Sequence, residues 1–418
     1  MAIVRRHRRQ PGCINHLRPV RPRRQIMLRR RLIMASACCA LGMAFSAQAA
    51  EIKVGLLSQF SGPYAWWGKE YQRGVDLYLA QIGNKIGTHT VTVLARDEGG
   101  TSPQKSRQLA QELVVRDQVQ YLLGGTFTPT VLGVTDVATQ TKTPFVICNA
   151  GTSSVTQKSP YFIRVGFTTW TVSVPLVQYA LSQNLKKAAI VAADYAPGQD
   201  AIDAFGQTLS KLGGTLSGEV KVPLGTTNFS SYLQRVRDLQ PQTVFMFMPV
   251  GPMSAGFIKA FKERELDKAG ITLLANAETN EADLGAIGDS ALGLTTALHY
   301  SPHLENATNK AFVAAYKTKY GKSELPSIAS LAAYDGMRLI AEMIRANDGV
   351  RDGDKAITAA KGFKWESPRG PVSIDPKTRE IVQNVYIRKV EKIDGQLGNK
   401  SFQTFTGVKD PWHEANPQ

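Results

Sequence analysis

From residue 52 onward, short runs rich in β-branched residues alternate with longer amphipathic stretches, and this alternation constrains the fold more than any other feature. Such an order is typical of a parallel sheet covered by helices. A first series extends to about residue 148, and a second series of similar size begins after about residue 170. The sequence therefore predicts two α/β domains.

The periodicity also predicts where each element lies. We expect strands at residues 52–57, 91–95, 121–123, 144–148, 188–193, 218–222, 243–248, 271–275, 294–298, 371–374 and 383–390. We expect helices at residues 66–82, 103–116, 130–141, 199–212, 229–239, 253–265, 306–320 and 327–347. In open parallel sheets, ligands bind beyond the carboxyl ends of the strands. We therefore expect the ligand-binding residues in the loops that follow the strands.

The positive charge of the chain is confined to its first residues. The formal net charge is +16, but residues 1–50 carry eleven Arg and no Lys, Asp or Glu. The remaining residues hold 39 Lys and Arg against 34 Asp and Glu, a net charge of only +5. The composition of the main body therefore does not indicate a nucleic-acid partner.

The front end has the pattern of a secretory signal. Arg29–Arg31 precede an apolar run at residues 32–45, which is too short to span a membrane, and Ala47–Ala49 form a small-x-small cleavage site. We expect cleavage after Ala49 or at the next residue, and export to the periplasm. A non-cleaved anchor and a lipoprotein modified at Cys38 fit the pattern less well. Translation is expected to begin at Met27, with Met1 as the alternative.

Several classes of chemistry lack their usual residues. Export would leave Cys148 as the only cysteine, in an apolar context typical of a buried strand. The four remaining His have no metal-ligand spacing, and no GxSxG or GxGxxG motif is present (His89, His299, His303 and His413). We therefore expect no catalytic residues, no metal and no cofactor, and we predict that the protein is not an enzyme.

Three aromatic residues gather in the loop after the first expected strand. Tyr64, Trp66 and Trp67 lie within the sequence SQFSGPYAWWG. Aromatic side chains at a helix start are costly to leave in water unless they pack or bind something. We expect Tyr64 and Trp66 to pack onto the domain and Trp67 to contact a ligand.

Two hydroxyl-rich loops predict an anion site. Residues 124–129 (GGTFTP) and 149–154 (NAGTSS) each follow an expected strand. Backbone N–H groups near a helix N-terminus attract anions, and a carboxylate is the natural occupant. The alternative is simple helix capping by Thr128 or Thr152. Neither loop carries the GK[ST] sequence of a phosphate loop.

Longer motifs resemble a known family. They are IKVGLLSQFSGPYAWWGKEYQRGVDLYL, PFVICNAGTSS, VAADYAPGQDAIDAF and WESPRGPVSID. From Ile52 to about Val390 the chain resembles the periplasmic solute-binding proteins of ATP-binding-cassette importers, in the branch of the Leu/Ile/Val-binding proteins. The resemblance implies two Rossmann-like lobes with parallel sheets, linked at a hinge by three crossovers. It places residues 1–49 in the extension and signal peptide, residues 51–168 plus 297–372 in lobe 1, and residues 169–296 plus 373–418 in lobe 2.

The resemblance also implies ligand-binding positions in lobe 1. Trp67 is similar to an aromatic residue over the side-chain pocket. Thr126 or Thr128 falls where a hydroxyl reaches the ligand carboxylate. Ala150 and Thr152 match a backbone and a hydroxyl contact to the same carboxylate.

In lobe 2 and at the hinge, the resemblance implies three further ligand-binding positions. Tyr195 matches an aromatic residue that closes over the ligand, and Glu278 lies near an acid that pairs with an amino-acid ammonium. Tyr300 lies beside His299 near the hinge crossing. The implied function is capture of a small hydrophobic carboxylate, either an aromatic acid or a branched-chain amino acid, for an inner-membrane permease. We expect a monomer, and a sensory ligand-binding protein is a further alternative.

Overall fold

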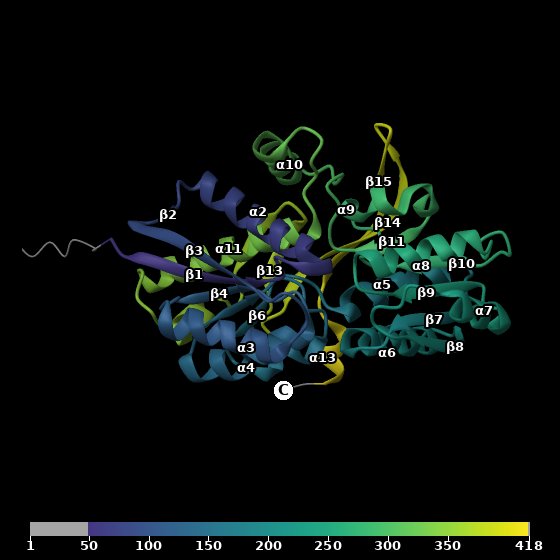
Figure 1. The fold of residues 1–418 in the computed structure, drawn as a ribbon, viewed down its shortest axis with the longest axis horizontal. Coiled ribbons are helices and arrows are strands. Elements are labelled where there is room, and N and C mark those ends of the chain that lie inside the picture. Colours follow the sequence, from purple (N-terminus) through teal and green to yellow (C-terminus); the bar gives the residue numbers. More distant parts are fainter. Residues whose placement is uncertain (1–48, 417–418) are drawn as a thin grey trace, which may run out of the picture. The chain divides into compact units, whose positions relative to one another are not determined.

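The computed structural model describes residues 49–416, so the predicted signal segment lies outside the described residues. Two separate sheets organise these residues, one of six strands and one of nine (Figure 1). We call the part built on the six-stranded sheet the first lobe and the part built on the nine-stranded sheet the second lobe. In the described part of the chain, no helix has both the length and the apolar character needed to cross a bilayer.

The six-stranded sheet has the order β2-β3-β1-β4-β5-β6. All neighbours are parallel except β2, which pairs antiparallel with β3 at the edge. The strands are β1 (Glu51–Ser58), β2 (Lys85–Ile86), β3 (His89–Asp97), β4 (Tyr121–Gly124), β5 (Phe145–Ile147) and β6 (Phe162–Arg164).

Alternation along these strands gives the first sheet two apolar faces. Leu123 and Val146 belong to the core formed with one pair of helices, whereas their neighbours Leu122 and Phe145 belong to the core on the other face. The first pair of helices is α2 (Ala65–Gln81) and α11 (Ile328–Asn347). The second pair is α3 (Pro103–Gln111), extended by the π-helical turn η2 (Glu112–Arg116), and α4 (Thr128–Thr141).

The nine-stranded sheet has the order β12-β13-β14-β11-β10-β9-β7-β8, with β15 paired to β14. Strands β7 to β11 are parallel, whereas β14 runs antiparallel to β11. The parallel strands are β7 (Lys187–Ala193), β8 (Thr215–Val222), β9 (Thr243–Phe247), β10 (Thr272–Ala275) and β11 (Thr295–Leu298). The others are β12 (Lys364–Ser367), β13 (Gly370–Ile374), β14 (Ile381–Ile393) and β15 (Gln396–Val408).

Strand β7 shows how this sheet separates its two cores. Ile190 packs with one set of helices, and its neighbour Val191 packs with the other set. The first set is α5 (Thr169–Ser182) and α6 (Ala196–Lys211). The second set is α7 (Ser230–Leu239), α8 (Pro252–Glu263) and α9 (Glu281–Ile287).

The chain passes between the two sheets more than once. It leaves the first sheet after β6, and it returns after β11 through α10 (Ala307–Tyr320) and α11, which packs against α2 and β4. Helix α12 (Gly353–Ala360) then leads to β12, and the short helix α13 (Pro411–Ala415) ends the described chain. The two α/β lobes confirm the predicted fold class. The predicted boundary at residue 372 falls inside β13. The lobe boundaries stay a prediction.

Candidate functional site

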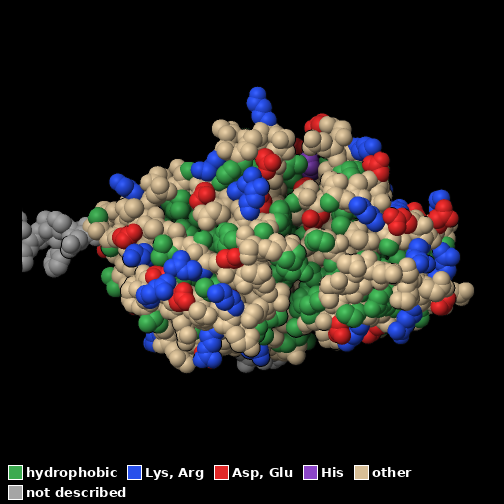
Figure 2. All heavy atoms as spheres, in the orientation of Figure 1, with side chains coloured by type: hydrophobic (Ala, Val, Ile, Leu, Met, Phe, Trp, Pro, Cys, Tyr) green, Lys and Arg blue, Asp and Glu red, His purple; other side chains and the backbone are tan. Residues whose placement is uncertain are grey.

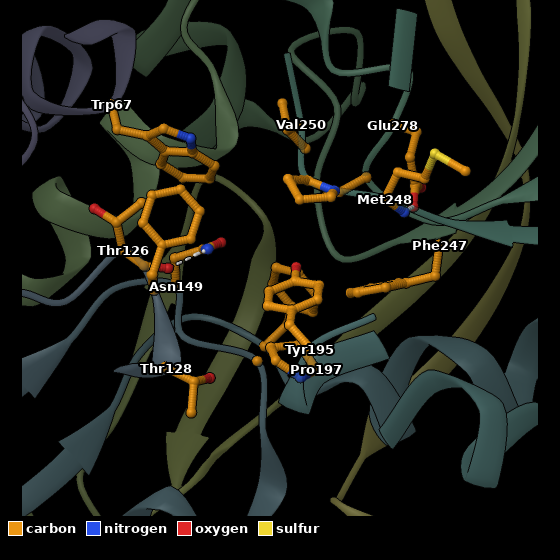
Figure 3. A pocket seen from close by; sticks show the side chains of 15 residues that line it. Trp67, Thr126, Thr128, Asn149, Tyr195, Pro197, Phe247, Met248, Val250 and Glu278 are labelled. Carbon is orange, nitrogen blue, oxygen red and sulfur yellow. Dashed lines mark hydrogen bonds between the residues drawn. The ribbon is translucent and has the colours of Figure 1, made fainter. Parts of the chain in front are cut away.

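A cavity lies where strand-end loops of both sheets meet. Figure 3 shows the side chains of the two lobes facing each other across it. The lining residues are Trp67, Thr126, Phe127, Thr128, Asn149, Gly151, Phe167, Tyr195, Pro197, Phe247, Met248, Pro249, Val250, Ala277 and Glu278.

Trp67 forms one aromatic wall. It lies in the first turn of α2 and is 3% exposed. Its ring meets those of Trp66 and Tyr71 edge-on, with centroids 5.0 and 5.9 Å away. Such contacts fix the orientation of the indole. The ligand contact expected of Trp67 stays a prediction, and its place at the cavity is consistent with it.

Neutral polar groups of the first lobe form one end of the cavity. Thr126, Thr128 and Asn149 line it, and the Asn149 side-chain amide donates to the Thr126 carbonyl at 2.8 Å (Figure 3). The turn before them depends on Gly124, which has φ +123°. A Cβ at Gly124 would lie 2.0 Å from the Leu57 carbonyl oxygen, so only glycine allows this close approach of the loop to β1.

Thr128 begins α4, and this helix end can attract an anion. The residue before it, Phe127, is the N-cap and gives no side-chain cap. The capping alternative for Thr152 also fails, because its side chain makes no cap hydrogen bond at the start of the 3₁₀ helix η3 (Ser153–Lys158). The positive end of the α4 dipole therefore lies beside the hydroxyl groups of the cavity.

Two predicted contacts, Ala150 and Thr152, do not line the cavity. The Ala150 N–H donates to the Gly125 carbonyl at 3.0 Å, and its own carbonyl accepts from Arg164 at 2.7 Å. The Thr152 hydroxyl accepts from the Thr128 hydroxyl at 3.1 Å. Gly151, between them, is the residue of this loop that lines the cavity together with Asn149. The predicted loop reaches the cavity through these two residues, whereas Ala150 and Thr152 turn their polar groups into the protein, and the ligand contacts expected of them stay a prediction.

The second lobe supplies a mainly apolar wall. Tyr195 and Pro197 lie at the start of α6, and Phe247 and Met248 lie at the end of β9. The rings of Tyr195 and Phe247 are stacked, with centroids 6.4 Å apart. Burial raises the pKa of Tyr195 far above its usual value, so its hydroxyl stays neutral. Tyr195 thus lies in the cavity wall opposite Trp67, as Figure 3 shows.

Glu278 is the one carboxylate among the lining residues of the described chain. It is fully buried, and its two oxygens accept from the backbone N–H groups of Met248 at 2.9 Å and Asn276 at 2.7 Å. Burial raises the pKa of Glu278 to about 7, although these bonds and the charge of Arg388 oppose the shift. Near neutral pH, Glu278 therefore exists in both its neutral and its ionised form.

Tyr300 does not line the cavity. It is fully buried, and its hydroxyl donates to the Asn309 side chain at 3.0 Å, within the second crossing of the chain. The adjacent His299 is also buried, and burial holds its pKa well below the usual value. Its ring lies 5.4 Å from that of Phe167, a cavity residue, so His299 supports the cavity from behind.

The remaining titratable candidates lie elsewhere or are inert. Cys148 is buried directly after β5, as predicted, and burial raises its pKa to about 12, which suppresses thiolate chemistry. Among the described residues, no group of three or more His, Cys, Asp or Glu is placed to hold a metal ion. On the face drawn in Figure 2, basic and acidic side chains are interspersed.

Most of the cavity residues that sequence reasoning missed are apolar. Phe167 follows β6, a three-residue strand that was not predicted. Phe247 and Met248 were assigned to the last two residues of an expected strand rather than to the loop that follows it. Asn149 and Gly151 belong to a loop already identified, and the polar side chain of Asn149 was the available signal.

Comparison with known proteins identifies the family. Residues 51–396 match the family model described as periplasmic binding protein. The chain belongs to this family. Its members are extracytoplasmic solute-binding receptors, which are not an enzyme class.

Two kinds of relative agree with this assignment. The chain is similar to the Leu/Ile/Val-binding protein homolog 6 of Brucella melitensis, with 44% identity over 91% of this chain and 98% of the relative. It is also similar to a solute-binding protein of an ABC transporter from Rhodopseudomonas palustris HaA2, solved in complex with p-hydroxybenzoic acid. That match has a TM-score of 0.84 and 44% identity, and covers 86% of this chain and 98% of the other.

A further solved relative carries a related ligand. The solute-binding protein from Rhodopseudomonas palustris BisB5 was solved in complex with 3,4-dihydroxybenzoic acid. It matches with a TM-score of 0.82 and 41% identity, over 87% of this chain and 99% of the other.

Proposed function

We propose that this periplasmic binding protein captures an aromatic carboxylate, such as a hydroxybenzoate, and delivers it to an inner-membrane ABC permease. One observation carries the proposal: the cavity combines neutral hydrogen-bond donors at one end with aromatic walls around the rest. Five aromatic residues line it, namely Trp67, Phe127, Phe167, Tyr195 and Phe247. A flat ring fills such a space with stacking and edge contacts on several sides.

The polar end suits a carboxylate. Thr126, Thr128 and Asn149 place hydroxyl and amide groups next to the N-terminus of α4. Each hydrogen bond to a charged group contributes about 1.5–3 kcal/mol, so a few such bonds can hold an anion without a salt bridge. The relatives solved with 4-hydroxybenzoate and 3,4-dihydroxybenzoate support the same ligand class.

Other parts of the proposal follow from the receptor role. The chain acts as a monomer in the periplasm, without enzymatic activity, cofactor or nucleic-acid partner. Its signal peptide is cleaved near Ala49, and translation begins at Met27. The charge pattern of the first 50 residues supports export.

A branched-chain amino acid is the second candidate. Glu278 lines the cavity, and its ionised form can pair with a ligand ammonium. The Brucella relatives named as Leu/Ile/Val-binding homologs support this candidate. The aromatic walls and the neutralising effect of burial on Glu278 favour the aromatic acid.

A thermal-shift screen of the mature protein tests the proposal. The panel is benzoate, 4-hydroxybenzoate, 3,4-dihydroxybenzoate, L-leucine, L-isoleucine and L-valine. A ligand present at 100 times its dissociation constant adds about 2.7 kcal/mol to the free energy of unfolding, which gives a clear rise in Tm. We expect the rise with one or more aromatic acids. A rise with the amino acids alone would contradict the aromatic assignment.

A further inference from the structure

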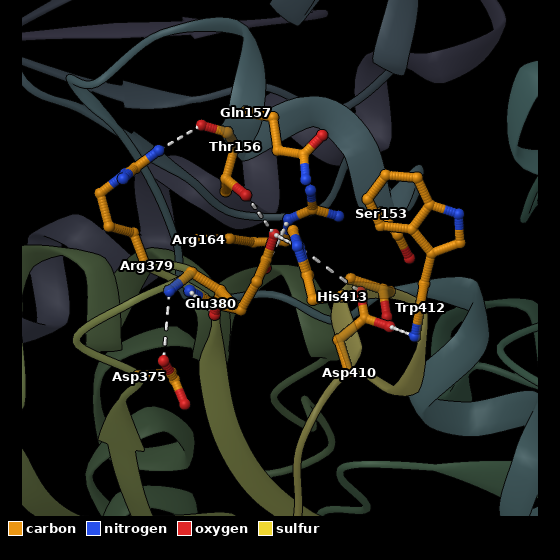
Figure 4. A network of polar contacts seen from close by, with 12 residues as sticks. Ser153, Thr156, Gln157, Arg164, Asp375, Arg379, Glu380, Asp410, Trp412 and His413 are labelled. Atoms are coloured by element: carbon orange, nitrogen blue, oxygen red, sulfur yellow. Dashed lines mark hydrogen bonds and ion pairs between the residues drawn. The ribbon is translucent and has the colours of Figure 1, made fainter. Parts of the chain in front are cut away.

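A buried arginine lies directly behind the loop that lines the polar end of the cavity. Arg164, the last residue of β6, is 0% exposed. Its two terminal nitrogens donate to the carbonyls of Ala150 at 2.7 Å and Thr152 at 2.8 Å, and its Nε lies 3.1 Å from a Glu380 carboxylate oxygen. Figure 4 shows this pairing beneath η3. The charge is thus buried but compensated.

These two bonds set the direction of two backbone N–H groups. In a trans peptide the carbonyl and the N–H point in opposite directions. Because the Ala150 carbonyl faces Arg164, the N–H of Gly151 faces away from it, and Gly151 lines the cavity. Because the Thr152 carbonyl also faces Arg164, the N–H of Ser153 is turned outward in the same way.

The Ser153 N–H meets the second lobe. It donates to a carboxylate oxygen of Asp200 at 2.9 Å. Asp200 lies in α6, the helix whose start carries the cavity residues Tyr195 and Pro197. Burial raises the pKa of Asp200 to about 6, with the charge of Arg164 opposing the shift. This hydrogen bond therefore joins the two lobes beside the cavity loop.

The described lining of the cavity supplies no positive side-chain charge of its own. Of the described residues that line it, none is Lys, Arg or His. An anion held only by neutral groups is stabilised when those groups are themselves polarised by a cation behind them. Arg164 is placed to polarise the Gly151 and Ser153 peptides at once.

We propose that Arg164 is a positioning residue that couples carboxylate binding to lobe closure, by aiming the Gly151 N–H at the ligand and the Ser153 N–H at Asp200. The proposal rests on the proposed function only in that the ligand carries a carboxylate. It holds equally for an aromatic acid and for an amino acid. The acid group, rather than the ring, is what Arg164 recognises through the backbone.

The test compares acids with their amides by calorimetry. The probes are 4-hydroxybenzoate with 4-hydroxybenzamide, and L-leucine with L-leucinamide. We expect Arg164→Lys to weaken acid binding by about tenfold or more, since a loss of 1.4 kcal/mol is a factor of ten, and to narrow the preference for acid over amide. Equal losses for acid and amide would show a purely structural role and overturn the proposal.

Arg379 offers a matched control. Its guanidinium is also buried next to Glu380, but it donates to the carbonyls of Phe162 and Thr156, away from the cavity loop. Arg379→Lys should keep the wild-type preference for acid over amide. A loss of that preference equal to the loss in Arg164→Lys would contradict the assignment to Arg164.

Asp200→Ala tests the coupling in a variant that keeps Arg164. It should weaken binding of the acid and its amide by the same factor, about three- to tenfold, because it removes a closure contact rather than a ligand contact. Amide hydrogen exchange should be faster at Ser153 than in the wild type, with or without ligand. Unchanged exchange at Ser153 would overturn the closure part of the proposal. If only leucine binds, the proposed ligand class fails, and the leucine pair still tests Arg164.

Discussion

Glu278 gives ligand binding a pH dependence whose sign distinguishes the two ligand classes. Its pKa of about 7 means that raising the pH from about 6 to about 8.5 converts most of it to the ionised form. An aromatic acid is an anion throughout this range, so ionised Glu278 repels it. An amino acid carries an ammonium, which ionised Glu278 attracts. Affinity for an aromatic acid therefore falls as the pH rises, and affinity for an amino acid rises.

The magnitude follows from the size of the ligand. For a ligand carboxylate at the hydroxyl end and Glu278 at the other wall, we take a charge separation of roughly 8 Å, which at an effective dielectric of about 20 gives about 2 kcal/mol. This corresponds to about thirtyfold between the neutral and ionised forms. Some Glu278 is ionised at the lower pH and some stays neutral at the higher one, so the expected loss of affinity is about tenfold.

Calorimetry at the two pH values measures this effect directly. Titrations in two buffers of different ionisation enthalpy should also show that binding of an aromatic acid near neutral pH takes up protons. Glu278→Gln should flatten the pH dependence. Asp283→Asn is the matched control, because burial also raises the pKa of Asp283, to about 6, but Asp283 does not line the cavity. An aromatic acid that binds more tightly at high pH would refute the reasoning.

Three further predictions concern the cavity and export. Trp67→Ala should weaken binding of an aromatic acid at least tenfold by calorimetry and lower the free energy of unfolding by about 3 kcal/mol, since it removes a buried indole. Trp66→Ala, outside the cavity lining, should weaken binding much less, because Trp66 acts only through its edge contact with Trp67. Thr128→Val should weaken acid binding by about tenfold. Thr152→Val should weaken it by less, because Thr152 acts only through its hydrogen bond with Thr128. The opposite order would contradict the placement of the carboxylate. Intact mass spectrometry of protein from the cell envelope should show a chain that starts directly after Ala49 or one residue later, and a chain that retains the arginines of the front end would disprove cleavage.

The order of strands and helices was predictable where burial follows a simple period. Strand β7 is a nearly continuous apolar run between polar turns, and helix α11 begins at a Ser327 cap and keeps its apolar positions in register. Helix α5 was missed for a physical reason. It is buried on most sides, so it shows no amphipathic period, and it contains Pro175, which usually indicates a helix end. Strand β15 was missed because its residues are mostly exposed and polar.

The candidate site was predictable at the level of loops but not of individual contacts. The rule that ligands bind beyond strand ends led to the loops of Trp67, Thr128, Tyr195 and Glu278. No sequence pattern shows that Arg164, which lies twelve residues after Thr152, donates to two carbonyls of that loop and so orients its N–H groups. That choice depends on tertiary packing.

A calorimetric titration of the mature protein with 4-hydroxybenzoate, beside 4-hydroxybenzamide and L-leucine, tests the central claim most directly. The account predicts binding of one molecule of the acid per chain, with weaker or no binding of the amide and of leucine, because the cavity joins an aromatic pocket to a carboxylate site. Binding of leucine without binding of the aromatic acid would contradict it.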